Sequence, residues 1–377
     1  MALSSRKPIN IEDYRQLANK RLPRMVFDYL DGGADNEVSL RHNRTALDSI
    51  RLRPKRLIDV SKRRMDTELF GKRLAAPLAI APTGLNGIFW PKGDLALARA
   101  AAKFNIPFIL SSASNASIEE VASCCNGDKW FQLYVIHRRL AKQLVERALN
   151  AGYSTLVLTT DVAVNGLRER DLRNGFGLPL RYTPRVVLDG CLHPRWSLNL
   201  LRQGVPQLAN FKSADAQDTE VQAALLARQM DASFDWEALE QLRELWPHTL
   251  LIKGIIDPTD AARCIESGAD GVVLSNHGGR QLDSCQSPIE TLQQTISTIN
   301  EPVLIDSGFR RGTDIVKAIA MGAQGVLLGR ALLYALAADG QSGVEHALEL
   351  IISEIDRTLA NLGCPSIDEL NSSFVQS

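Results

Sequence analysis

Eight short apolar runs recur along the chain from residue 76 onward, and helical spacing of apolar residues returns between them. Within each run the apolar residues occupy consecutive rather than alternate positions, which is typical of parallel strands buried on both faces. Eight such units of strand and helix predict a closed (β/α)₈ barrel, the TIM barrel. The predicted strands are 77–81, 107–110, 130–135, 155–158, 250–253, 271–274, 302–305 and 326–328.

The rest of the chain divides around this repeat. Residues 1–75 are expected to form an N-terminal helical flank or lid, with one or two helices over 11–30 before the turn Asp31-Gly32-Gly33, and 76–377 to form the barrel domain. Ser117 and Thr313 are expected to cap helices. The helices predicted between the strands are 94–103, 117–124, 140–151, 258–267, 288–299 and 313–320.

Polar side chains gather at or just past the ends of the predicted strands. In a (β/α)₈ barrel the carboxyl ends of the strands form the active face, so these side chains are expected to surround one site. Lys253 is the strongest indicator, because burying its charge without a partner would be costly. The polar residues are Thr83, Ser111, Gln132, Tyr134, Asp161, Lys253, His277 and Asp306.

A long insertion, about 162–235, separates the fourth and fifth predicted strands. It far exceeds the usual connection length, which favours a functional role. Within it, 182–211 interleaves apolar and aromatic residues with arginine, but its apolar runs are too short to span a bilayer. This pattern suits a segment that lies in the membrane interface. It equally suits a loop packed on the barrel or on a neighbouring subunit.

Composition and charge exclude some classes of partner. Lys plus Arg and Asp plus Glu both total 43, so no global positive field attracts nucleic acid, and none is expected as a partner. The six cysteines form no CxxC pair and lie in no zinc-finger pattern, so reduced thiols and no metal site are expected. The first ten residues lack the apolar stretch of a signal peptide, which favours a cytoplasmic location or a membrane surface facing the cytoplasm.

The run Ser275-Asn276-His277-Gly278-Gly279-Arg280 follows the apolar segment 271–274 directly. Histidine can take a proton near neutral pH, and arginine can bind a carboxylate through two parallel hydrogen bonds. The two glycines let the backbone pass close to a ligand. Together these residues indicate a site for a small acidic molecule. For an isolated His-Gly-Gly, a tight turn that caps a helix would be the better interpretation.

The chain resembles the FMN-dependent 2-hydroxy acid dehydrogenase and oxidase family. The residues that carry the likeness are 275–283, 306–311 and 328–330, in this order and at the ends of the last three predicted strands. Within the family, the segments 81–87, 161–166 and 187–197 are most similar to the mandelate dehydrogenases, in which the region equivalent to 182–211 binds the membrane. The resemblance implies FMN as cofactor and an (S)-2-hydroxy acid as substrate.

The resemblance also assigns a cofactor site. Thr83, Gly84, Ser111, Gln132 and Thr159 are placed around the flavin ring, and Lys253 and Ser275 near its N1 and O2 edge. A cation at that edge stabilises the negative charge that reduction creates. Asp306 is assigned to the ribityl chain. The residues assigned to the phosphate are Gly308, Arg310, Gly329 and Arg330, after strands seven and eight, where such sites recur in this fold.

The substrate site follows from the same likeness. His277 is the implied base that removes a proton from the hydroxy acid, with Asp161 as its partner. Arg280 and Arg168 are expected to hold the carboxylate, and Tyr29 and Tyr134 to hydrogen-bond to the substrate, with Tyr134 and Arg280 also counted as catalytic. Transfer of a hydride and formation of a carbanion remain alternative routes, and both need the same base.

Two positions bear on the choice of substrate and electron acceptor. Ala113 stands where glycolate oxidases carry tryptophan, which leaves room for a phenyl ring and favours (S)-mandelate, oxidised to benzoylformate. Gly84 stands where they carry alanine, and with a membrane segment it favours a respiratory quinone over oxygen. The family suggests a homotetramer, here peripheral on the cytoplasmic face of the inner membrane. The alternatives are an L-lactate dehydrogenase or hydroxy acid oxidase and, more distantly, an inactive flavin-binding scaffold.

Overall fold

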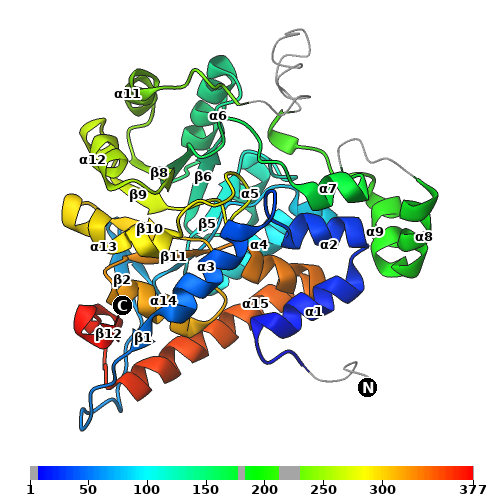
Figure 1. The fold of residues 1–377 in the computed structure, drawn as a ribbon. Coiled ribbons are helices and arrows are strands. Elements are labelled where there is room, and N and C mark those ends of the chain that lie inside the picture. Colours follow the sequence, from blue (N-terminus) through cyan, green and yellow to red (C-terminus); the bar gives the residue numbers. More distant parts are fainter. Residues whose placement is uncertain (1–6, 177–182, 212–229, 377) are drawn as a thin grey trace.

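A computed structural model describes residues 7–176, 183–211 and 230–376, and in it eight parallel strands close into a barrel (Figure 1). All eight predicted strands form, with bounds shifted by at most two residues, and the predicted fold class is confirmed. Their order around the barrel is β10-β11-β4-β5-β6-β7-β8-β9. The strands are β4 Leu78–Ile80, β5 Phe108–Ser111, β6 Lys129–Leu133, β7 Thr155–Thr159, β8 Thr249–Ile255, β9 Gly271–Leu274, β10 Val303–Ile305 and β11 Gly325–Leu328.

Each strand contributes one side chain to an inner core. This cluster is sealed by Leu69 and Leu74, from the hairpin of β2 Thr67–Leu69 and β3 Lys72–Leu74, and by the edge of Phe70 against Trp130. The interior is therefore a packed core with one end closed, as expected for this fold. The inner residues are Ala79, Ile109, Trp130, Val157, Leu251, Val273, Leu304 and Leu327.

Helices surround the barrel and turn their apolar faces inward. They are α4 Gly93–Lys103, α5 Ile118–Cys124, α6 Arg138–Asn150, α11 Trp236–Leu245, α12 Pro258–Glu266, α13 Pro288–Thr298, α14 Gly312–Ala320 and α15 Arg330–Leu362, the last broken at Asp339 and Gly340. Ser117 caps α5 in a capping box, as predicted. The prediction for Thr313 is wrong. The N-cap of α14 is Arg311, and the Asp314 carboxylate accepts its backbone N–H, so Thr313 lies inside the first turn.

Between residue 7 and the barrel, the structure contains three helices. The predicted helical stretch forms α1 Ile11–Arg21 and α2 Arg24–Asp31, separated by Pro23, and α1 packs along α15 (Figure 1). The sequence interpretation did not include α3, Val38–Ser49. Near the opposite end of the chain, β12 Val375–Gln376 pairs with β1 Arg51–Leu52.

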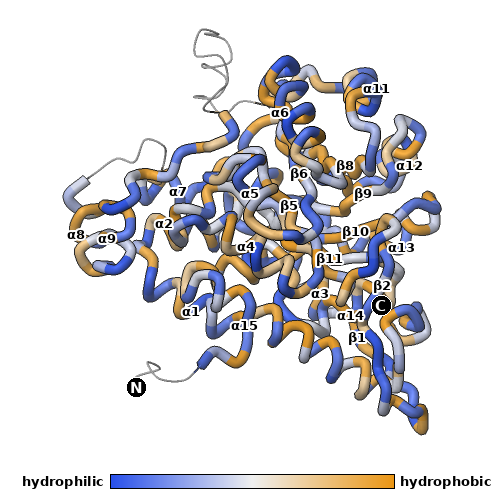
Figure 2. The backbone as a smooth tube through the Cα atoms, turned by 180° about the vertical axis from the view of Figure 1, so that it is seen from behind, coloured by the Kyte–Doolittle hydropathy of each residue, from blue (hydrophilic) through white to orange (hydrophobic). Residues whose placement is uncertain are grey.

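The described part of the predicted insertion consists of short helices joined by irregular segments. It contains α7 Glu169–Asn174, α8 Pro184–Leu192, α9 Pro194–Gln203 and the 3₁₀ turn Ala209–Phe211. Residues 177–182 and 212–229 lie outside the described ranges, and with them Tyr182 of the predicted membrane segment. The α8–α9 pair projects from the side of the barrel (Figure 1) and carries hydrophobic stretches (Figure 2).

The α8–α9 pair is anchored by one side and open on the other. Trp196 is buried, and its indole N–H donates to the Ile88 carbonyl at 2.7 Å. In contrast, Leu192 and Leu201 are 72% and 82% exposed. One face of the segment therefore packs on the barrel loops, as the second alternative expects, and the other face is exposed. Within 7–176, 183–211 and 230–376, no helix combines the length and apolar character needed to cross a bilayer.

Candidate active site

The carboxyl ends of the strands open into a cavity of about 240 Å³. Most of the residues predicted from the sequence line it, although they come from all parts of the chain. Gln132, Asp161 and Ser275 lie behind its wall and contact lining residues. The predicted lining residues are Tyr29, Thr83, Gly84, Ser111, Tyr134, Thr159, Arg168, Lys253, His277, Arg280, Asp306, Gly308, Arg310, Gly329 and Arg330.

His277 is held between a carboxylate and a phenol. Its backbone is left-handed, with φ 57°, and its N–H donates to Ser275 Oγ at 3.0 Å. Nδ1 lies 2.9 Å from Asp161 Oδ1, and Nε2 lies 3.3 Å from the Tyr134 hydroxyl. Because a carboxylate accepts the proton on Nδ1, Nε2 is left as the basic atom of the neutral ring.

The charge state of the neighbours suits this arrangement. Burial acts to raise the pKa of Asp161, but the charge and hydrogen bond of His277 and the charge of Lys253 lower it below its ordinary value. Asp161 is therefore a carboxylate that can stabilise an imidazolium. Burial raises the pKa of Tyr134, so its hydroxyl stays protonated and can donate a hydrogen bond.

Lys253 is buried with a matching carboxylate. Its side chain is 5% exposed, and Nζ lies 2.8 Å from both Asp306 Oδ2 and Ser275 Oγ. Burial acts to lower the pKa of Lys253, but Asp306 and Asp161 raise it above its ordinary value. The lysine is therefore a fixed cation at the base of the cavity.

Two further cations are held differently. Arg280 Nη1 donates to the carbonyls of Tyr29 at 2.8 Å and Gly32 at 2.9 Å. Arg330 donates to the carbonyls of Leu30 at 3.1 Å, Gly32 at 2.7 Å and Gly278 at 2.9 Å. Burial lowers the pKa of both guanidinium groups, to about 9 for Arg330, and a group with that pKa is still protonated at neutral pH.

Carbonyl dipoles orient these arginines without neutralising them. Within the described part of the chain, neither guanidinium forms an ion pair with a carboxylate, whereas Arg168 pairs with Asp171 at 3.0 Å. Tyr29 lies under two cations, with Arg280 5.1 Å and Arg168 5.7 Å from its ring centroid. The cavity therefore presents uncompensated positive charge, which suits anionic ligands.

A chain of hydrogen bonds lines another side. Ser111 Oγ donates to Gln132 Oε1 at 2.9 Å, and Gln132 Nε2 donates to Thr159 Oγ1 at 3.0 Å. Thr83 Oγ1 donates to Asn86 Oδ1 at 3.0 Å. These side chains stand at the ends of β4 to β7, where the barrel brings them together.

The sequence profile of the FMN-dependent dehydrogenases matches residues 18–377. The chain belongs to this family, and FMN is its cofactor. Over 99% of this chain and 95% of the relative, it is 61% identical to (S)-mandelate dehydrogenase of Pseudomonas putida. It is 44% identical to L-lactate dehydrogenase of Chromohalobacter salexigens, over 96% of this chain and 93% of the relative.

Solved structures of related enzymes resemble this chain in both fold and sequence. The crystal structure of the monotopic membrane protein (S)-mandelate dehydrogenase superposes with a TM-score of 0.95, at 61% identity, over 98% of this chain and 100% of that one. A mandelate oxidase structure is 36% identical with a TM-score of 0.81, over 96% of both chains.

The cavity fits FMN chemically. The phosphate needs cations and close backbone approach, and Arg310, Arg330 and Gly308, with φ 93°, all line the cavity. Gly329 is the N-cap of α15, and the N-terminus of a helix favours an anion. Lys253 is a buried cation, of the kind that would stabilise the negative charge of a reduced flavin ring. The cavity therefore offers cations and accessible backbone for the FMN phosphate, and a buried cation for the flavin ring.

Sequence reasoning missed several contributors. Asn43 on α3 and Asn276 exchange amide hydrogen bonds of 2.9 and 2.7 Å, which fasten the loop that carries His277. Ser307, with φ 76°, accepts the N–H of Gly278 at 3.0 Å. No local pattern in the sequence indicated these contacts. The apolar wall was also missed: Phe89, Ile136, Val162, Leu208, Phe211 and Met230.

Proposed function

We propose that the chain oxidises (S)-mandelate to benzoylformate with FMN and passes the electrons to a membrane quinone. The observation that carries the proposal is the convergence on one cavity of the His277–Asp161 pair and the carbonyl-held Arg280. A base and an unneutralised cation on the same side of a flavin site are what a 2-hydroxy acid needs. The identity of 61% to (S)-mandelate dehydrogenase supports the choice of substrate.

In this mechanism His277 Nε2 takes the proton that the substrate loses. Asp161 holds Nδ1 and stabilises the imidazolium that forms, and the neutral Tyr134 hydroxyl donates to the substrate oxygen beside the base. Bound FMN supplies the acceptor for the two electrons that leave C2. In a hydride route this proton comes from the hydroxyl and the C2 hydrogen leaves with both electrons; in a carbanion route it comes from C2 and the hydroxyl proton is lost as the electrons leave.

Arg280 binds the substrate carboxylate. Since its Nη1 hydrogens are taken by the carbonyls of Tyr29 and Gly32, the remaining N–H groups can pair with a carboxylate in fork geometry. Arg168, over the ring of Tyr29, is the second cation proposed for this group. The Tyr29 side chain itself is proposed to hydrogen-bond to the carboxylate.

The apolar wall accepts the phenyl group. Ala113 lines the cavity beside Gly84, together with Leu208 and Phe211 from the insertion. A phenyl ring that leaves water for such a wall gains hydrophobic stabilisation, which a methyl group of lactate gains to a smaller extent. Glycolate has no apolar group on C2 that could contact this wall.

Anaerobic reduction of the flavin tests the proposal. We expect the purified protein to be yellow and to be bleached faster by (S)-mandelate than by (R)-mandelate, L-lactate or glycolate at equal concentration. Reoxidation should be faster with a soluble quinone than with air. A colourless protein that does not take up FMN, or a higher kcat/KM for L-lactate, would overturn it.

L-lactate dehydrogenase is the second candidate, because relatives of that name are 42–44% identical over most of the chain. The same substrate panel separates the two. An inactive scaffold would keep the flavin but would be bleached by none of the four acids.

The α8–α9 pair is proposed to bind the membrane interface peripherally. Its exposed leucines, including Leu188, Leu192 and Leu201, lie beside the exposed Arg195 and Arg202, a combination that favours an anionic bilayer surface. A relative of the same fold is a monotopic membrane protein. We place this contact on the cytoplasmic face of the inner membrane, with a homotetramer as the assembly. Sedimentation with anionic vesicles tests the membrane contact, and light scattering tests the homotetramer.

A further inference from the structure

The turn after α2 holds the two uncompensated arginines of the cavity. The Gly32 carbonyl accepts from Arg280 at 2.9 Å and from Arg330 at 2.7 Å, so one backbone oxygen orients both. The carbonyls of Tyr29 and Leu30, just before the turn, and the carbonyl of Gly278, on the His277 loop, complete the set. Because these acceptors belong to the backbone, the conformation of the turn decides where both guanidinium groups point.

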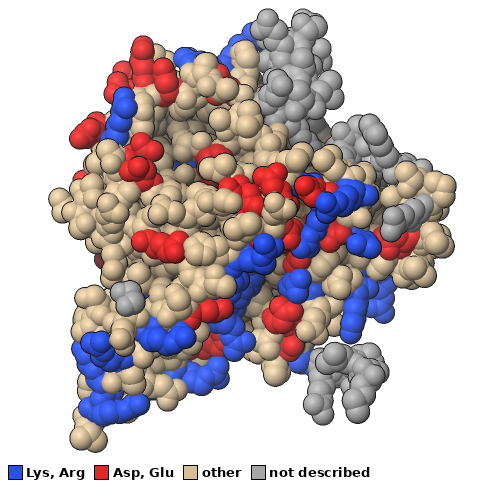
Figure 3. Space-filling view, viewed as in Figure 1, with Lys and Arg blue, Asp and Glu red and all other residues tan. Residues whose placement is uncertain are grey.

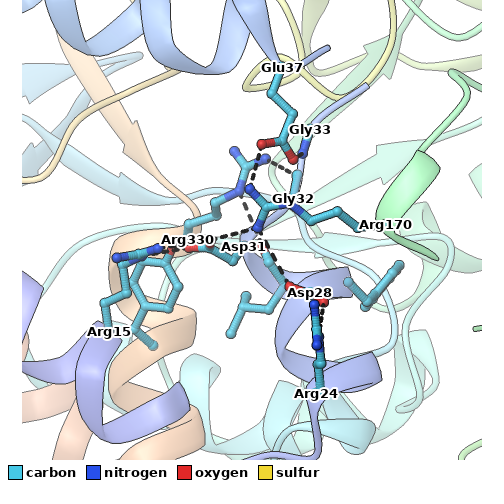
Figure 4. A network of polar contacts seen from close by, with 12 residues as sticks. Arg15, Arg24, Asp28, Asp31, Gly32, Gly33, Glu37, Arg170 and Arg330 are labelled. Atoms are coloured by element: carbon cyan, nitrogen blue, oxygen red, sulfur yellow. Dashed lines mark hydrogen bonds and ion pairs between the residues drawn. The ribbon is translucent and has the colours of Figure 1, made fainter. Parts of the chain in front are cut away.

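A side-chain bridge fixes that turn from outside. Arg170 pairs with Asp31 at 3.1 Å and with Glu37, and Glu37 Oε1 accepts the Gly33 N–H at 2.9 Å (Figure 4). Glu37 has a left-handed backbone, with φ 59°, which a non-glycine residue adopts at some cost. Gly33 also lies against the His277 loop, where an added Cβ would come within 2.7 Å of the Gly279 carbonyl oxygen.

The bridge joins the insertion to the turn. Arg170 is on α7, where Asn174 Nδ2 also donates to Asp28 Oδ2 at 2.7 Å. On α8, the Asp189 carboxylate accepts the backbone N–H of Arg24 at 2.7 Å. Acidic and basic side chains alternate over this face of α2, α3 and α7 (Figure 3). Arg170 does not line the cavity and is one-third exposed, so it acts on a ligand only through the turn.

The bridge also pairs the charge of the buried Asp31 carboxylate. The Asp31 carboxylate is buried and is engaged by Arg15 at 2.6 Å, by Arg170 and by the Tyr334 hydroxyl at 2.7 Å. Burial lowers the pKa of Arg330 and the nearby Asp31 acts to raise it, but the hydrogen bonds and ion pairs of the Asp31 carboxylate in the described part of the chain are with Arg15, Arg170 and Tyr334. Arg330 then keeps its charge available for an anion.

We propose that Arg170 and Glu37 are positioning residues for ligand binding, which hold the Gly32 carbonyl so that Arg280 and Arg330 face the substrate carboxylate and the FMN phosphate. The inference rests on the proposed function in assigning these two groups to the two arginines. It makes the insertion a support for substrate binding in addition to its membrane role.

The test measures carboxylate binding without turnover. Phenylacetate, which has no hydroxyl to oxidise, is titrated into the FMN-loaded protein and followed by the flavin absorption spectrum. In Arg170→Met we expect Kd for phenylacetate and KM for (S)-mandelate to rise roughly tenfold, the value of one hydrogen bond to a charged group. The flavin reduction rate at saturating (S)-mandelate should stay within about twofold, because the base is untouched.

Matched variants separate positioning from folding. Arg170→Lys should recover part of the loss, since one ammonium can pair with one of the three carboxylates that Arg170 faces, Asp28, Asp31 and Glu37. Glu37→Gln should have a smaller effect, and little further effect in the Arg170→Met background. Arg173→Met, on the exposed side of the same helix in a pair with Glu169, should behave as the parent.

Several outcomes would overturn the inference. One is unchanged phenylacetate binding in Arg170→Met, and another is an equal loss in Arg173→Met. A fall in the saturated reduction rate as large as the loss of binding, with no rescue by Arg170→Lys, would leave only a structural role. Failure of the proposed function is visible separately, as absence of flavin reduction by (S)-mandelate in the parent protein.

Discussion

Replacing Lys253 by methionine should be costly, because it leaves a buried charge without its partner. The Lys253 and Asp306 side chains are 5% and 12% exposed, and Nζ lies 2.8 Å from Oδ2. Removing one member of a buried pair typically costs about 3–5 kcal/mol, against at most about 1 kcal/mol for an exposed pair. Asp306 keeps the Ser307 hydroxyl as a donor at 2.8 Å, which favours the lower end of that range. We therefore expect Lys253→Met to lower the free energy of unfolding by about 3 kcal/mol.

The assay is urea unfolding of the FMN-stripped protein, followed by circular dichroism. Lys253→Met is compared with Asp306→Asn and with the double variant, which has no unpaired charge and should be more stable than Lys253→Met alone. With FMN bound, Lys253→Met should also reduce its flavin more slowly, because the cation that stabilises the reduced ring is lost. A cost below about 1 kcal/mol, or a double variant less stable than the single one, would refute the reasoning.

Three further predictions follow from other parts of the structure. His277→Gln should retain FMN while anaerobic reduction by (S)-mandelate slows about 10² fold or more, and stopped-flow rates near those of the parent would remove His277 as the base. Changing Leu192 and Leu201 to serine should weaken sedimentation with anionic vesicles by roughly tenfold or more without changing flavin reduction, whereas equal sedimentation would exclude this surface. Burial acts to raise the pKa of Asp31, but its hydrogen bonds with Arg15 and Tyr334 lower it below the unfolded value. Its stabilising contribution is therefore present above the ordinary carboxyl pKa of about 4 and lost as pH falls below it, so Asp31→Asn should flatten the acid side of a stability profile against pH.

The barrel was predictable because its strands are buried on both faces. A run such as 271–274 is apolar at every position, and the structure forms β9 over Gly271–Leu274. The helices of the insertion were harder to predict. In α9 the apolar residues lie in two different environments. Trp196 is buried against the barrel, whereas Leu201 is exposed. The sequence pattern therefore did not distinguish a helix from an irregular interfacial segment.

The polar side chains of the site were predictable for a geometric reason. In a closed parallel barrel every strand delivers its carboxyl end to the same face, so Thr159, Lys253 and His277 had to meet once their strands were placed. The contacts that orient them could not be predicted in this way. Asn43 and Asn276 are 233 positions apart, and the Gly32 carbonyl has no side chain for a pattern to reveal.

The site buries its cations in two ways, and the difference indicates where anions bind. Lys253 is compensated by Asp306, so it can tune a neutral ring without attracting a second carboxylate. Arg280 and Arg330 are held by carbonyls, which fix their direction and leave their charge uncompensated in the described part of the chain. A buried cation without a counter-charge is unfavourable until a ligand supplies one. Two anionic groups are proposed for this cavity, a carboxylate and a phosphate. When they bind, they therefore stabilise the turn that holds Arg280 and Arg330.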